Sequence, residues 1–188
     1  LGSGYLSGNN SFGDLAKAEF YTNSQTRQVT GAYYLLARAV VNGTGTIQAC
    51  VWDASGVGGS PGAAPLASVS VNISTIIANI ASQSFTFVTF PTTPTVTGNF
   101  YVGYILPTGA GDTVAIATTT INSPSVGQGW EQYGDATWHT YNEFWGQYVS
   151  GFEVSNIVYP IVCAPSTAPT ASFTANNTAV CAGSTVNF

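Results

Sequence analysis

The residues best suited to chemistry gather between positions 123 and 151, where large aromatic side chains follow one another closely. Three of the four tryptophans of the chain lie in this stretch. Flat Trp and Tyr rings stack on sugar rings, and neighbouring Asp and Gln side chains hydrogen-bond the sugar hydroxyls. The candidates for such a site are Trp130, Gln132, Tyr133, Asp135, Trp138, Tyr141 and Trp145.

Two other roles are open for the same aromatic residues. They can cap one end of the fold as part of its core. They can also bury against another copy of the protein or another surface protein, since Trp and Tyr contribute strongly to protein interfaces. The sequence alone leaves the sugar platform, the core and the subunit interface open.

The sequence gives no support for catalysis. His139 is the single histidine, and no carboxylate stands next to it in the sequence. Ser60 stands in a Gly-x-Ser-x-Gly pattern at 58–62, but this Gly- and Pro-rich segment is predicted to form a turn, not the strand-to-helix elbow of hydrolases. Glu131, Asp135 and Glu143 could form a glycosidase pair, but loop carboxylates on an acidic chain are usually solvated. We therefore expect a protein that is not an enzyme and that uses no cofactor.

Charged residues are scarce and mostly acidic. They make up 6% of the chain, and eight acidic residues face three basic ones, Lys17, Arg27 and Arg38. No basic patch can neutralise a run of phosphates, which excludes nucleic acid as a partner. Apolar stretches such as 73–81 fall short of the roughly 20 residues that cross a bilayer, so no membrane insertion is expected. Low charge also favours close packing between copies.

The cysteines form an odd set, Cys50, Cys163 and Cys181, so at most one disulfide can form within the chain. We expect Cys163 to pair with Cys181, and Cys50 to be a buried thiol in a strand. Cysteines this far apart, with one histidine, lack the close spacing of zinc ligands, so no metal is predicted. Calcium at Asp53 or Asp112 is open, but no dense carboxylate loop supports it.

The periodicity of the chain is that of strands. Short runs of β-branched and aromatic residues are separated by Gly, Pro, Asn and Asp. One helix is expected over 73–80, with Ser74 as its cap. The pattern predicts an all-β, antiparallel, jelly-roll-like β-sandwich with a short C-terminal β-strand extension. The predicted strands cover 16–22, 29–40, 45–52, 67–72, 84–90, 99–106, 113–119 and 153–162.

A linker at 164–170 (APSTAPT) separates two units, a β-sandwich module at 1–164 and a short unit at 165–188. The segments APTASFTA at 168–175 and VCAGSTVNF at 180–188 closely resemble the first two strands of a PKD-type immunoglobulin-like repeat. Such repeats are common in large secreted and surface proteins of the Bacteroidetes phylum. A piece this short cannot fold alone, so it belongs to a longer chain or a neighbour completes it.

Turn and core signatures along the first ~165 residues resemble a β-sandwich module of type IX secretion cargo. This resemblance implies an extracellular or cell-surface location. It also implies a module that accompanies adhesins, peptidases or glycan-degrading enzymes without being their active part. The matching segments are GYLSGNN at 4–10, VWDASG at 51–56, GSPG at 59–62, GNFYVG at 98–103 and GWEQ at 129–132.

The same resemblance bears on modification. Asp112, Thr113 and Val114 fit the acidic, hydroxyl, apolar triplet that Bacteroidetes use for O-glycosylation, which implies a modified Thr113. Asn-x-Ser/Thr sequons also occur. In a bacterium of this kind we expect their asparagines to be ordinary turn residues: Asn9, Asn42, Asn72 and Asn176.

Two functions follow from these observations. The first is a non-catalytic structural or adhesive module of a secreted cell-surface protein or extracellular fibre, which assembles through its C-terminal strands by strand addition. The alternative is a carbohydrate-binding accessory domain of a secreted hydrolase, with glycans as its partners.

Overall fold

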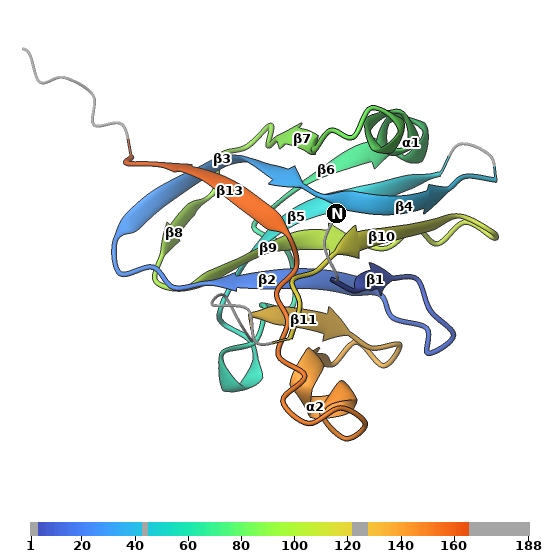
Figure 1. Cartoon of the computed structure of the whole chain (residues 1–188). Coiled ribbons are helices and arrows are strands. Elements are labelled where there is room, and N and C mark those ends of the chain that lie inside the picture. The colour runs from blue at the N-terminus through green and yellow to red at the C-terminus, as the bar shows by residue number, and fades with distance from the viewer. Residues whose placement is uncertain (1–3, 43–44, 122–127, 166–188) are drawn as a thin grey trace, which may run out of the picture.

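The chain folds mainly into β-strands, as the computed structural model shows for residues 4–42, 45–121 and 128–165 (Figure 1). The helices are α1 (Ile73–Ala81), α2 (Tyr141–Trp145) and the short 3₁₀ helix η1 (Val57–Gly59). The strands are β1 (Leu6–Gly8), β2 (Ala16–Tyr21), β3 (Thr26–Tyr34), β4 (Leu36–Val40), β5 (Thr46–Asp53), β6 (Ala67–Asn72), β7 (Thr86–Thr89), β8 (Thr95–Thr97), β9 (Phe100–Ile105), β10 (Thr113–Ala117), β11 (Gly129–Gln132), β12 (Trp138–Thr140) and β13 (Val158–Cys163).

The strands form two layers. One layer is a six-stranded sheet in the order β12-β11-β2-β9-β5-β6, and all its neighbouring strands are antiparallel. The other layer holds two smaller antiparallel sheets, β1-β10-β4 and β13-β3-β7, with β8 also paired to β3. Strands β3 and β4 follow each other across Leu35, whose backbone N–H donates to the carbonyl of Ile157. One nearly continuous stretch of chain therefore belongs to both smaller sheets.

The main core lies between the two layers. Alternate residues of β5, such as Ile47 and Val51, point inward from the six-stranded sheet and are fully buried, as a strand with one covered face requires. They belong to one cluster with Val29 of β3 and Ile116 of β10. The Tyr34 hydroxyl in this core donates to the carbonyl of Gly103 at 3.0 Å, so its burial leaves no polar atom unpaired.

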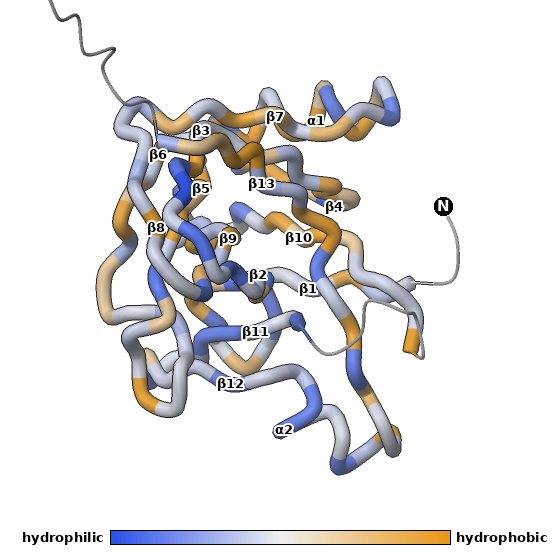
Figure 2. The backbone as a smooth tube through the Cα atoms, turned by 90° about the vertical axis from the view of Figure 1, so that its left-hand side faces the viewer, coloured by the Kyte–Doolittle hydropathy of each residue, from blue (hydrophilic) through white to orange (hydrophobic). Residues whose placement is uncertain are grey.

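A second, smaller cluster covers the outer face of the six-stranded sheet. It contains Ala18, Cys50, Trp52 and Tyr101. Burial raises the pKa of the Cys50 thiol to about 12, which keeps it protonated at neutral pH. The prediction of a buried Cys50 in a strand is therefore confirmed. Figure 2 shows β11, β12 and α2 at the end of the molecule opposite α1 and β7.

The prediction of an all-β antiparallel sandwich is confirmed, whereas jelly-roll connectivity stays a prediction. Every predicted strand coincides at least in part with an observed one, but 29–40 is interrupted at Leu35 and the last strand begins only at Val158. The predicted position of the helix is confirmed, whereas the predicted N-cap residue is wrong. Asn72, not Ser74, is the N-cap residue, because the helix already begins at the buried Ile73.

Part of the predicted C-terminal unit lies outside the described residues. Cys163 is exposed at the end of β13, and Cys181 falls in 166–188, so the disulfide between them stays a prediction. The two PKD-like segments and Asn176 fall in the same range. None of the helices in the described part of the chain is long and apolar enough to span a bilayer.

Helix α1 packs on the core through buried isoleucines, and a substitution in it measures how much this packing stabilises the fold. Ile76 is 0% exposed, whereas its neighbour Ile77 is 37% exposed. We predict that Ile76→Ala lowers the free energy of unfolding by about 3 kcal/mol, because it removes buried methyl groups and leaves a cavity. Ile77→Ala is the matched control and costs less than about 1 kcal/mol. Chemical denaturation measures both, and equal losses would contradict this packing.

Candidate functional site

A cavity of about 580 Å³ lies beside β1 and α2. Its volume is within the range of small-ligand pockets in proteins. Strands β1 and β10 supply much of its lining, and α2 with the segment that follows supplies aromatic side chains. Residues from β2, β4 and β11 complete it. Six different elements thus meet at this one site.

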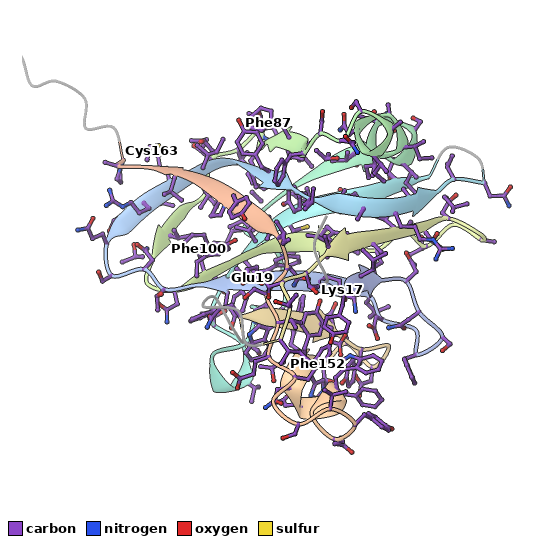
Figure 3. All side chains as sticks on the ribbon, viewed as in Figure 1. Lys17, Glu19, Phe87, Phe100, Phe152 and Cys163 are labelled. Carbon is purple, nitrogen blue, oxygen red and sulfur yellow. The ribbon has the colours of Figure 1, made fainter. Side chains whose placement is uncertain are left out.

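Aromatic rings form one wall of the cavity. Tyr5 packs on Phe152 with ring centroids 5.0 Å apart, and Trp145 lies 6.2 Å from the same phenylalanine. All three residues line the cavity, and Tyr5 is 43% exposed. Its ring is therefore free to contact a bound molecule. Figure 3 shows Phe152 beside α2, at the end of the molecule away from Phe87.

Local sequence explains how Trp145 is held. Helix α2 is a single short turn, which would not persist alone in water. Thr140 and Glu143 form a capping box, in which the Glu143 carboxylate accepts the Thr140 N–H at 3.1 Å. Tyr141 at the first turn is buried, which anchors the helix. Trp145, at the last position, is thereby held at the cavity.

A buried ion cluster contributes Lys17 and Glu131 to the polar lining of the cavity. The Lys17 ammonium, 1% exposed, donates to Asp14 and to Glu131, the latter at 2.9 Å. Glu131 of β11 lies directly opposite Lys17 of β2 in the sheet register. Burial raises the pKa of the Glu131 carboxyl, and the nearby Lys17 charge opposes this rise. Lys17 also lies 5.7 Å from the centroid of the Tyr141 ring.

Tyr141 connects this cluster to β1. Its hydroxyl lies 2.7 Å from the Ser7 hydroxyl and 2.8 Å from the side-chain oxygen of Asn156. The Asn156 amide in turn donates to the carbonyl of Ala18 at 2.8 Å. These bonds fix the side chains of the cavity before any ligand binds, which lowers the entropy cost of binding.

Glu19 is a further buried carboxyl, and it lies on the same face of β2 as Lys17. It accepts the backbone N–H of Asn156 at 2.6 Å and hydrogen-bonds the side chain of Ser155. Burial nevertheless raises its pKa to about 8, because removing the carboxylate from water costs more than these bonds return. Figure 3 shows Glu19 close to Lys17 in the middle of the molecule.

The structure divides the seven predicted site residues among three places. Tyr141 and Trp145 line the cavity. Trp130 and Trp138 instead pack on the outer face of the six-stranded sheet. The ring centroids of Trp130 and Tyr101 are 5.6 Å apart, and those of Trp138 and Trp52 are 5.5 Å apart. The remaining three lie at the β11–β12 hairpin: Gln132, Tyr133 and Asp135.

The β11–β12 hairpin also gives His139 neighbours that the sequence analysis did not identify. Its Nδ1 atom lies 2.9 Å from the Glu143 carboxylate, and its Nε2 atom lies 2.7 Å from the Thr137 hydroxyl. Thr137 in turn donates to Asp135 at 2.6 Å, and the Tyr133 ring stacks on the imidazole with centroids 4.3 Å apart. These contacts hold the hairpin against α2.

Several cavity residues were missed by the sequence analysis, and four of them matter most here: Tyr5, Lys17, Arg38 and Phe152. For Lys17 a signal existed, since Lys17 and Glu19 alternate with alanines in a chain with very few charges. Two charges on one face of a strand indicate a polar site on that face. For the other three no local signal existed, because the fold alone brings them together.

The predicted modification and calcium residues all hold turns or strand ends. Thr113 is half-buried at the start of β10 and lines the cavity, and its glycosylation stays a prediction. Asp112 accepts the Asn42 N–H at 2.6 Å, and Asp53 accepts the Ser55 hydroxyl at 2.5 Å. Asn9 accepts the Val114 N–H at 2.9 Å. Within the described ranges, no three His, Cys, Asp or Glu side chains gather as metal ligands.

Comparisons with protein-family models, with curated proteins and with solved structures found no match to this chain.

The raised pKa of Glu19 predicts that the stability of the fold decreases as pH rises toward 8. Its pKa is about 8 in the folded chain and about 4.5 in the unfolded one, so the folded state holds an extra proton between these values. The free energy of unfolding should therefore fall as pH rises from about 4.5 to about 8, by at most roughly 5 kcal/mol.

The test replaces the carboxyl by an amide that keeps the hydrogen-bond acceptor. Glu19→Gln should flatten the profile of unfolding free energy between pH 5 and pH 8. Glu153→Gln removes an exposed carboxyl instead and should leave the profile of the unaltered chain. Denaturation with urea at several pH values measures this, and a profile that Glu19→Gln does not change would refute the assignment.

Proposed function

We propose that this chain is a non-catalytic adhesive module of a secreted cell-surface protein, and that its cavity binds carbohydrate. One observation carries the proposal: a partly exposed aromatic wall meets preorganised polar groups in a cavity of about 580 Å³. Such a pairing suits sugars, whose C–H faces pack on aromatic rings while their hydroxyls need hydrogen-bond partners.

Each part of the cavity has a role in this proposal. Tyr5 and Trp145 offer ring surface to a sugar face. Ser7 and Thr113 supply hydroxyls, and Glu131 supplies a carboxyl oxygen, at the same cavity. The ion cluster around Lys17 keeps the polar groups in place before a ligand binds, so that little side-chain entropy is lost on binding.

The proposed location rests on the sequence. The resemblance to type IX secretion cargo and to PKD-type repeats of Bacteroidetes supports a secreted, surface-attached parent protein. A surface dominated by hydroxyl and amide groups, with only 6% charged residues in the chain, is compatible with close contact to uncharged polymers. The alternative of an accessory domain of a secreted hydrolase uses the same cavity in the same way.

Removal of a ring from the cavity wall tests the proposal. Tyr5→Ala should weaken binding to the glycans identified on an array by about tenfold, since a stacked ring contributes on the order of 1 kcal/mol or more. The matched control is Tyr159→Ala, which removes an exposed tyrosine on β13 that is not part of the cavity. Isothermal titration calorimetry gives both affinities.

Two results would count against carbohydrate binding in this cavity. One is an array on which no glycan binds the unaltered chain. The other is equal loss of affinity in Tyr5→Ala and Tyr159→Ala, which would place the binding site elsewhere. Thermal unfolding of both variants shows whether each remains folded.

A second function, self-assembly, is favoured by the outer face of the β13-β3-β7 sheet. Tyr33, Phe85, Phe87 and Tyr159 form an exposed aromatic patch there, with Tyr33 and Phe87 centroids 4.8 Å apart. Within the described residues, β13 pairs only with β3, so its outer edge is open to strand addition. A second copy added at this edge would extend the sheet and cover the patch.

Assembly is tested by removing an aromatic ring from the patch. Phe87→Ser should shift the chain from oligomers or filaments toward monomers, as measured by light scattering and electron microscopy. Val57→Ser is the control, because Val57 is 96% exposed in η1, outside the patch. A chain that is monomeric at high concentration, or that assembles equally with Phe87→Ser, would remove this second function.

A further inference from the structure

We infer that the saccharide bound in this cavity carries a carboxylate, and that Arg38 binds that group. The inference rests on the proposed carbohydrate function and names the class of sugar. It arises from the distribution of charge around the cavity, which differs from that of the chain as a whole.

Basic side chains are concentrated at the cavity. The chain has three basic residues and a net charge of −5. Two of the three, Lys17 and Arg38, line this one cavity, and among the described residues that line it only Glu131 is acidic. The lining therefore carries two basic side chains and one acidic one, whereas the chain as a whole is acidic, so an anion is repelled less here than by the average surface of the protein.

Lys17 is already engaged and does not select the ligand. Its ammonium is buried between the carboxylates of Asp14 and Glu131. In turn it neutralises one of their two negative charges. The cluster therefore has no positive charge left for an anion, and a negatively charged ligand must be paired by another group.

Arg38 is that group. It lies on β4 directly opposite Ala115 of β10, and both residues line the cavity. Arg38 is exposed, and among the described residues its guanidinium has no hydrogen bond or ion pair. Arg27, by contrast, donates to the side chain of Gln25. Arg38 is therefore a free cation held at the edge of an aromatic cavity.

The chemistry of this cation indicates a carboxylate. A guanidinium presents parallel N–H groups that match the two oxygens of a carboxylate, and it sheds water more readily than an ammonium does. A uronic acid offers this carboxylate on the same ring whose C–H face can stack on Tyr5 or Trp145. One ligand thus uses both the aromatic wall and the unpaired charge.

The experiment compares an acidic sugar with its neutral form on the whole chain. Tetragalacturonate and its full methyl ester have the same ring system and differ in charge. Calorimetry at low salt should give an affinity about tenfold higher or more for the acid, because hydrogen bonds to charged groups are the stronger ones. Arg38→Gln should remove this difference, whereas Arg27→Gln, with the same charge change, should keep it.

The outcomes separate this inference from the function on which it rests. If the acid and the ester bind equally and Arg38→Gln changes neither affinity, the carboxylate is wrong while carbohydrate binding stands. If neither binds and no glycan on the array binds, both ideas fail. A sulfated oligosaccharide of equal length that binds tighter than the uronate would overturn the carboxylate assignment. Equal thermal unfolding of Arg38→Gln and Arg27→Gln would show that folding does not explain the difference.

Discussion

The buried ion cluster of Lys17, Asp14 and Glu131 is the interaction on which the site depends. An ammonium taken out of water is costly unless it is paired, and here two carboxylates pair it. Asp14 ties the loop before β2 to the cluster, and Glu131 ties β11 to β2 in register. Loss of one partner would leave a buried charge, which is far more destabilising than loss of an exposed pair. Each of these two strands gives one side chain to the cavity lining, Lys17 from β2 and Glu131 from β11.

The six-stranded sheet separates two sets of aromatic residues. On its outer face, Trp130 and Trp138 pack against Trp52 and Tyr101 and so belong to the smaller hydrophobic cluster. On the inner side, Tyr141 and Trp145 reach the cavity by way of α2. Aromatic residues that are neighbours in the sequence therefore have different roles, because a strand alternates its side chains between two faces and a helix follows it. The dense aromatic stretch supplies both part of the core and part of the site.

The sequence predicts the longer elements well, because five or more residues are enough for alternation and turn signals to be recognised. Strands β1, β8, β11 and β12 contain only three or four residues each and were not predicted. The interruption at Leu35 also has no local signal, since it depends on a backbone bond to Ile157. The site follows the same rule. Tyr141 and Trp145 could be identified within one stretch, whereas Tyr5 and Arg38 join them only through the pairing of β1, β10 and β4.

The scarcity of charge has a consequence for how the molecule responds to its medium. Dissolved salt weakens interactions between exposed charges and acts much less on buried pairs. With 6% of its residues charged and its central ion cluster buried, the chain offers few interactions that ionic strength can weaken. Its fold should be nearly the same in fresh water and in brine. If salt weakens the binding of a ligand to this protein, the cause should therefore be sought in the few exposed charges and not in a change of the fold.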